Sequence, residues 1–181
     1  MKLVLQKKTT DDPLKIITKM IDVLIDDFCN EMSHMRFYLE AASSIAGPER
    51  LEYREFFLEE AKSEMGHVDE FRNLIFSLSI RHGVYVNFSG KNNINEKLSN
   101  CDIPKNIIAK NDVSSLLQQA INLEDEVVNN YVKRIEDTQL LQESNVDKVK
   151  VDGKYIEIFL EDQIMHSRSD ANEMLRMLRK F

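Results

Sequence analysis

Glu64 and His67 are two side chains whose types and spacing could bind a metal ion. Residues three apart lie on one side of a helix, so the pair offers an oxygen and a nitrogen ligand together. Both fall on a helix face otherwise made of apolar residues: Leu51, Phe57, Phe71, Leu74 and Leu78. Ionisable groups in an apolar face are costly unless something neutralises them. A lone Glu-x-x-His also fits a charged turn of a surface helix. The pair indicates a metal site only if the other predicted helices supply matching ligands.

Composition favours a bundle of helices. The chain has 181 residues and 43% hydrophobic content, enough for one domain with a core. It contains five Gly, three Pro and no Trp, and 30% of its residues are charged. A net charge of −7 argues against broad nucleic-acid binding and is compatible with cations as partners.

The same reading predicts a cytoplasmic protein that does not enter membranes. Residues 1–5 carry no apolar segment long enough for a secretory signal, and no stretch is apolar enough to span a bilayer. Cys29 and Cys101 are too few and too far apart to indicate a disulfide framework. Cys29 falls away from the apolar face, so we expect it to pack rather than to act in redox chemistry.

Apolar periodicity predicts an all-α protein, a four-helix bundle in a single domain over residues 1–181. Asp12-Pro13 is a good helix start, Gly47-Pro48 separates two helices, and Gly83 can end one. The expected helices span about 13–46, 48–81, 113–142 and 154–179. Residues 84–111 have a loop composition. Such a long connection suits a crossover that makes the third helix parallel to the second.

A polar repeat interrupts these apolar rows. Glu31 is the single charged residue in the row of the first helix, and Tyr38 follows it by seven positions. Glu124 and Tyr131 repeat this pattern in the third helix. The second and fourth helices each carry a pair at i, i+3: Glu64/His67 and Gln163/His166. Matching polar residues in two hairpins are hard to explain by core packing alone.

This arrangement resembles the ferritin-like di-iron proteins, in which two helices supply a Glu and two supply a Glu-x-x-His. The closest resemblance is to the bacterioferritins and the bacterioferritin-like branch of the Dps family. It covers all four expected helices, through the motifs Asn30-Glu31 with Tyr38, Glu64-Met65-Gly66-His67, Leu123-Glu124 with Tyr131, and Asp162-Gln163-Ile164-Met165-His166.

The resemblance implies a role for each matching residue. Glu31 and Glu124 would be terminal carboxylates, one for each metal. His67 and His166 would be the terminal imidazoles, and Glu64 would bridge the metals. These five residues would also be the catalytic set.

Other residues are implied to support the ligands, and two depart from the family pattern. Asp162 would orient the histidine of the opposite hairpin, while Tyr38 and Tyr131 would hydrogen-bond ligand carboxylates. Gln163 stands where the family has a second bridging glutamate, and Ser63 replaces an acid expected before Glu64.

We therefore expect an asymmetric centre, with Gln163 at the weaker metal position. An amide carries no charge, so the metal beside Glu124 and His166 would bind ~10- to 100-fold less tightly. Asp162 could turn inward as a replacement ligand. His34 is also spaced as Glu-x-x-His with Glu31, but it lies one step off the apolar row, which predicts a structural role.

The function implied is that of an iron-binding ferroxidase for iron storage, detoxification and protection against oxidative stress. Iron would be the metal, although manganese or zinc also suits these ligands, and O2 or H2O2 would be the oxidant. After His166 we expect only a short remainder of the fourth helix and no fifth helix. Because the family's larger cages carry a fifth helix, the resemblance favours a homo-oligomeric cage of 12 rather than 24 subunits.

Three other functions remain open. A rubrerythrin-like peroxidase or an oxygenase would be a non-storage di-iron enzyme, although no Cys-x-x-Cys pair is present for a rubredoxin-like donor. A metal-free helical interaction protein would use the bundle as a binding surface. A Dps-like DNA-protecting protein could use a basic arm of Lys2, Lys7 and Lys8, but the acidic net charge opposes it.

Overall fold

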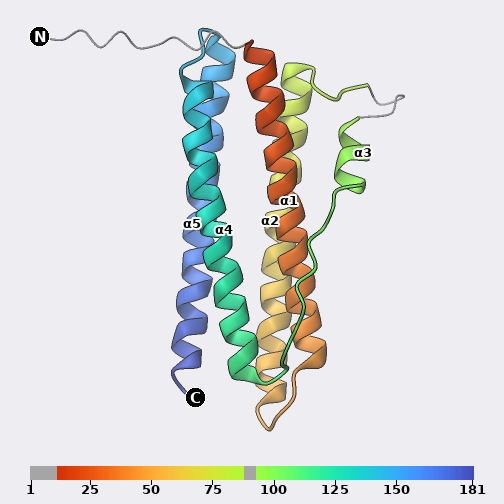
Figure 1. Ribbon diagram of the computed structural model, residues 1–181, viewed down its shortest axis with the longest axis vertical. Helices are drawn as coiled ribbons and strands as arrows, with labels where there is room; N and C mark the ends of the chain where they lie inside the picture. The colour runs from red at the N-terminus through yellow and green to blue at the C-terminus, as the bar shows by residue number, and fades with distance from the viewer. Residues whose placement is uncertain (1–11, 88–92) are drawn as a thin grey trace, which may run out of the picture.

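The computed structural model describes residues 12–87 and 93–181 (Figure 1). The helices of this described part are α1 (Pro13–Ser44), α2 (Arg50–His82), α3 (Ile94–Ser99), α4 (Val113–Gln142) and α5 (Asp147–Leu178). The prediction of an all-α bundle with a long crossover is confirmed. Lys2, Lys7 and Lys8 lie outside the described residues. Among the described helices, none is both long and apolar enough to cross a membrane.

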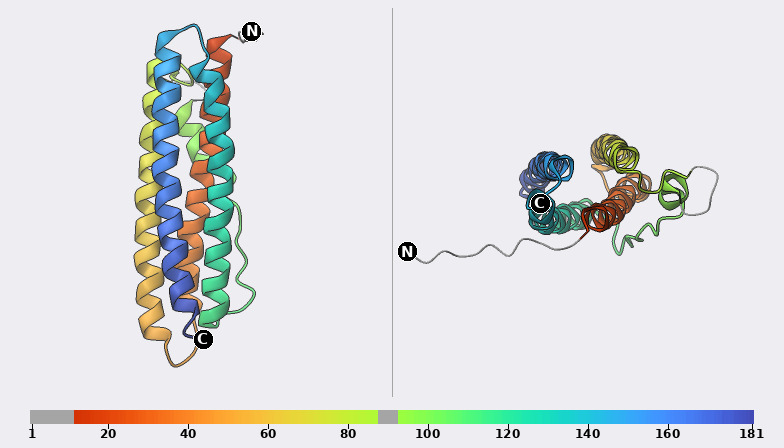
Figure 2. Two further views of the ribbon diagram at one scale, coloured as in Figure 1. Left: turned by 90° about the vertical axis from the view of Figure 1, so that its left-hand side faces the viewer. Right: turned by 90° about the horizontal axis from the view of Figure 1, so that it is seen from above.

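The bundle is made of two antiparallel hairpins, α1 with α2 and α4 with α5. They meet mainly along α1 and α4 (Figure 2). The crossover that carries α3 runs beside α1 along the bundle, so α4 begins at the end where α2 also begins (Figure 1). α4 is therefore parallel to α2, as a bundle with one long connection requires.

Local sequence explains most helix ends. The Asp12 side chain accepts a hydrogen bond from the backbone N–H of Leu14, and Pro13 occupies the first helical position. Gly83 ends α2 in the left-handed conformation, with φ of 70°. The start of α5 differs from expectation: it lies at Asp147, whereas the polar segment 144–153 predicted a turn and a helix from about Lys154.

Gly153 explains this difference, because it serves helix packing rather than a turn. A Cβ atom on Gly153 would lie 2.7 Å from Cβ of Leu141 and 3.1 Å from the backbone nitrogen of Gln142, both on α4. Only glycine allows α5 to approach α4 this closely. Val149 and Asp152 are buried in the same stretch, which a solvated turn would have left exposed.

A buried ion cluster joins the end of α2 to the beginning of α5. Asp152 accepts hydrogen bonds from Arg81, at 2.5 Å, and pairs with Nε2 of His82, at 2.6 Å. A buried carboxylate requires such partners. The cluster therefore connects the two hairpins at the end of the bundle away from the α1–α2 turn.

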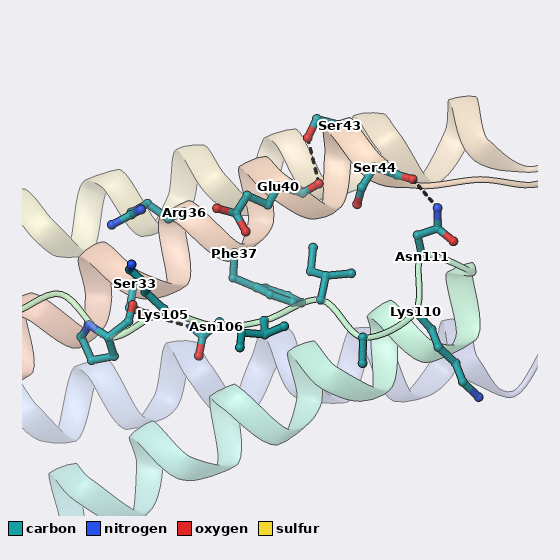
Figure 3. A pocket seen from close by; sticks show the side chains of 14 residues that line it. Ser33, Arg36, Phe37, Glu40, Ser43, Ser44, Lys105, Asn106, Lys110 and Asn111 are labelled. Carbon is teal, nitrogen blue, oxygen red and sulfur yellow. Dashed lines mark hydrogen bonds between the residues drawn. The ribbon is translucent and has the colours of Figure 1, made fainter.

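The crossover is held against α1 at several points. Ser33 donates a hydrogen bond to the carbonyl of Pro104 and accepts one from Asn106, each at 2.8 Å, and Asn111 donates to the carbonyl of Ser44 at 3.0 Å. These residues face one another across a pocket of about 630 Å³ between α1 and the crossover (Figure 3).

A disulfide between Cys29 and Cys101 joins the same two elements, with their Cα atoms 6.2 Å apart. The expectation that Cys29 only packs was therefore wrong. The two cysteines are 72 residues apart in sequence, but the crossover returns alongside α1 and brings them together. The spacing of the two cysteines in the sequence does not predict that the crossover returns alongside α1.

The apolar core consists of two clusters at different levels of the bundle. One contains Ile21, Leu24, Phe71 and Leu160, and the other contains Phe37, Phe57, Leu117 and Met174. Between them along the helices lies a layer of buried polar side chains: Glu31, His34, Glu64, His67, Glu124, Gln163 and Ser167. Apolar packing thus covers this layer above and below along the bundle.

Alanine substitution at the two helical glycines, Gly153 and Gly66, should have opposite effects on the stability of the protein. Gly153→Ala should lower the free energy of unfolding by roughly 1–3 kcal/mol, because the added methyl group collides with Leu141. Gly66→Ala is the matched control: no atom lies within 4 Å of its added Cβ, so it should raise stability by about 0.5–1 kcal/mol. Chemical denaturation of both variants measures the difference, and equal effects would contradict the close α4–α5 packing.

Candidate metal centre

Three glutamates from three helices lie in the polar layer. Glu31 on α1, Glu64 on α2 and Glu124 on α4 are each at most 2% exposed. Each occupies a position of the inward helix face where the neighbouring turns carry apolar residues, so the packing of those residues carries the carboxylates inward. The layer concentrates negative charge where solvent cannot screen it.

Glu31, Glu64 and His67 form a first cluster that could hold a metal ion, with one ligand atom from each within 4.8 Å of the others. Nδ1 of His67 lies 3.3 Å from Oε2 of Glu64 and 3.6 Å from Oε2 of Glu31. Glu64 and His67 are the pair that the sequence singled out, and the structure places Glu31 opposite them.

Two buried tyrosines connect the hairpins through these carboxylates. Tyr38 on α1 donates a hydrogen bond of 2.6 Å to Oε1 of Glu124 on α4. Tyr131 on α4 donates to Oε1 of Glu31 on α1. Each tyrosine therefore holds the glutamate of the other hairpin in a fixed orientation, which matters for a group that must ligate a metal.

A second cluster contains His34, Glu64 and Glu124, whose ligand atoms also lie within 4.8 Å of one another. His34 is 5% exposed. Burial lowers its pKa, which favours the neutral imidazole, the form that binds metals. Its position one step off the apolar row had predicted a structural role. However, α1 contacts both α2 and α4, so its buried face is wider than one row. The sequence signal that could have identified His34 as a candidate ligand was its position three residues after Glu31.

Among the described residues, neither cluster includes a side chain from α5. His166 is exposed, and its ring stacks on that of His67 with centroids 5.5 Å apart. Gln163 is buried, but its amide nitrogen donates to Oε2 of Glu70 on α2 at 2.7 Å. Asp162 is exposed and lines a pocket together with Gln163. Through its hydroxyl, Ser167 is the α5 side chain that hydrogen-bonds Glu124.

Proton affinities in the layer reflect the crowding of buried carboxylates. Burial opposes ionisation of Glu31, but hydrogen bonds from His67 and Glu64 outweigh it and lower its pKa to about 2. Burial and the charge of Glu31 raise the pKa of Glu64 well above its usual range. Burial also raises the pKa of Glu124 to about 7, against the hydrogen bond from Tyr38. Protons on Glu64 and Glu124 therefore offset the negative charge in this state.

These donors fit a pair of divalent cations. Three buried carboxylates cannot all ionise beside one imidazolium, whereas metal ions would replace the protons and compensate the charge. Carboxylate oxygens with imidazole nitrogens suit iron, manganese and zinc. Glu64 belongs to both clusters and is therefore placed to bridge two ions.

A polar groove follows the boundary between α2 and α5, beside the centre. It consists of two pockets of about 320 and 590 Å³ that share Glu70 and His166. Asp170 lines the pocket next to His67, and burial raises its pKa despite the charges of His67 and His166.

Glu60 adds a further acid to this region, one turn before Glu64 on α2. Burial is the main cause that raises its pKa to about 8, and the charges of Asp170, Glu124, Glu173 and Glu59 add to the shift. No neighbouring cation appears among these causes. The α2–α5 side of the centre is therefore acidic.

The fold is a helical bundle whose interior holds carboxylate–histidine clusters that could bind metal ions. A ferritin-like domain is matched by residues 21–146, more than half of the chain. The chain therefore belongs to the ferritin-like family.

Solved structures give the same fold. A ferritin-like, di-iron carboxylate protein from Bacillus anthracis str. Ames is 23% identical, with a TM-score of 0.65, over 90% of this chain and 97% of that one. A dodecameric thioferritin, the bacterioferritin-related protein of Bacteroides fragilis, is 20% identical, with a TM-score of 0.53, over 93% and 96% of the two chains. At these identities the likeness shows the fold alone. The comparison with curated proteins gives no match.

Replacement of Glu60 should change the pH dependence of stability in the metal-free protein. Between the ordinary pKa of 4.5 and the folded-state pKa of about 8, the folded protein retains a proton that the unfolded chain releases, so stability falls as pH rises. Glu60→Gln removes this loss. The free energy of unfolding of the variant should equal that of wild type near pH 4.5 and exceed it by roughly 1–2 kcal/mol at pH 8. This value is reduced for partial solvent screening.

Denaturant unfolding at several pH values measures this effect. Glu55→Gln is the control, because Glu55 is exposed on the same helix and is not among the groups that shift Glu60. A constant difference between Glu60→Gln and wild type across this pH range would contradict the acidic cluster.

Proposed function

We propose that this protein binds ferrous iron in the polar layer and catalyses its oxidation, for iron storage or detoxification and protection from oxidative stress. The observation that carries the proposal is the cluster of Glu31, Glu64 and His67, buried in the middle of the bundle with Glu124 facing it. Membership of the ferritin-like family supports iron as the metal.

The reaction requires two electrons from two ferrous ions. Each ion loses one electron, and O2 takes up both electrons with two protons from solvent to give H2O2. If H2O2 is the oxidant, the same two electrons and two protons give two molecules of water. Ionised glutamates favour the ferric product, because they compensate its additional positive charge.

The chain's own residues would organise this reaction. Glu64, which belongs to both clusters, would hold both ions close enough to deliver two electrons to one oxidant molecule. Tyr38 and Tyr131 hold Glu124 and Glu31 in orientation. The apolar clusters on either side exclude bulk water. The acidic groove along α2 and α5, with Glu60 and Asp170, would attract cations from solvent.

The groove also favours a second candidate, a non-storage di-iron enzyme such as a peroxidase or oxygenase. Its pockets, of about 320 and 590 Å³, are larger than O2 or H2O2 requires and could admit an organic substrate. Storage and non-storage functions differ in iron capacity. A storage protein takes up many ferric ions per chain, whereas the enzyme retains only those of its centre.

Glu64→Gln tests the ferroxidase proposal. The variant should oxidise ferrous iron at least about tenfold more slowly, a barrier increase of ~1.4 kcal/mol, because an amide carries no charge with which to bridge two cations. Anaerobic titration with ferrous iron followed by addition of O2, read by absorbance, measures binding and rate. Glu55→Gln is the exposed control on the same helix. Wild type that binds no ferrous iron, or Glu64→Gln that oxidises it at the wild-type rate, would end the proposal.

The same function predicts a closed homo-oligomer, since ferric product needs an enclosed cavity. We propose a dodecamer, supported by the dodecameric state named for the Bacteroides fragilis thioferritin. Light scattering should give about twelve times the chain mass of 21.1 kDa. A monomer at micromolar concentration would exclude the cage and leave the non-storage enzyme as the better explanation.

A further inference from the structure

We infer that His34, rather than the fourth-helix histidine His166, supplies the imidazole ligand of the second metal. The inference deepens the proposed function and rests on it. Each metal position then receives two carboxylate groups and one imidazole: Glu31, Glu64 and His67 at one position, and Glu124, Glu64 and His34 at the other. α1, α2 and α4 provide the complete set, and α5 provides no ligand.

The surroundings of His34 support this assignment. The side chain is 5% exposed and lies with Glu64 and Glu124 in a set whose ligand atoms are mutually within 4.8 Å. Ligands of one metal ion, each about 2 Å from it, are necessarily within such a distance of one another. Among the described residues, none forms a hydrogen bond with a ring nitrogen of His34. Metal binding by His34 would therefore break no existing hydrogen bond of its ring.

The α5 side chains are occupied elsewhere. His166 is exposed, and its ring stacks on the ring of His67. Gln163 directs its amide to Glu70, across the α2–α5 groove. A ring nitrogen of His34 already lies within 4.8 Å of a carboxylate oxygen of Glu124, whereas no such group among the described residues includes His166. An imidazole from α1 therefore needs the smaller movement to reach Glu124.

The crossover fixes the part of α1 that carries His34. Ser33, the preceding residue, is hydrogen-bonded to Pro104 and Asn106, and Cys29 is joined to Cys101, one turn away from Ser33. Successive side chains are about 100° apart around a helix. His34 therefore faces a different side of α1 from Ser33, and its side chain lies with Glu64 and Glu124 in the polar layer. Because these contacts restrain α1, His34 would lose less conformational freedom on binding a metal ion.

The assignment removes the reason for an asymmetric centre. Gln163 was expected to weaken one metal position because an amide replaces a carboxylate. With His34 as the ligand, both positions have the same donor types, and Gln163 lies outside both sets. Two metals of similar affinity follow, instead of one tight and one weak.

Cobalt(II) provides a test that does not depend on oxidation activity. We expect wild type to retain two cobalt ions per chain after gel filtration, and His34→Gln to retain one, with the second bound at least tenfold more weakly. His166→Gln, the matched control, should retain two with unchanged affinity. Metal analysis gives the stoichiometry, and the visible cobalt spectrum reports the loss of a nitrogen ligand in His34→Gln only.

Several results would overturn the inference. His34→Gln with two tightly bound ions, or His166→Gln with only one, would return the ligand role to α5. Wild type with a single ion would remove the second position, and wild type with none would overturn the proposed function as well. His34→Asn repeats the measurement with a smaller side chain. Circular dichroism of the metal-free variants verifies that each is folded before metal is added.

Discussion

The compensation of buried negative charge is the constraint on which the rest of this structure depends. Glu31, Glu64 and Glu124 lie at most 2% exposed in the middle of an apolar bundle. Without metal, His67 and protons held by the other carboxyls offset their charge. Tyrosine hydrogen bonds hold the carboxylates in place across the hairpins, and apolar clusters above and below remove solvent. A layer of buried carboxylates lowers the free energy of unfolding, and bound cations would offset that loss. The fold is therefore suited to metal binding.

The crossover has two consequences for the centre. It makes α4 parallel to α2. In this arrangement Glu124 and Glu64 lie at the same level, with ligand atoms within 4.8 Å of each other. It also holds α1 through the Cys29–Cys101 disulfide and the hydrogen bonds of Ser33. The opposite side of the bundle is different, because the groove between α2 and α5 is polar and acidic. The crossover thus restrains the α1 side of the polar layer, whereas the α2–α5 side carries the groove through which, under the proposed function, cations and oxidant would enter.

The sequence by itself determined the helices and most of the inward-facing polar residues. A helix repeats every 3.6 residues, so an apolar row with one charged member identifies both the buried face and the exception. Glu31, Glu64, His67 and Glu124 were found in this way, and the structure gathers all four in the polar layer. Turn and loop composition also predicted the crossover, because residues that break the period show where helices end.

Only the tertiary structure decided how the faces of different helices meet. His34 lies at the flank of its apolar row, and whether a flank position faces solvent or a neighbouring helix depends on how α1 is placed against α4. His166 lies on an inward row but is exposed, because the hairpins separate toward α5. Gly153 signalled a turn and instead permits close packing, and the disulfide required the return of the crossover. Periodicity records the orientation of a side chain about its own helix axis, whereas contacts depend on the distances between axes.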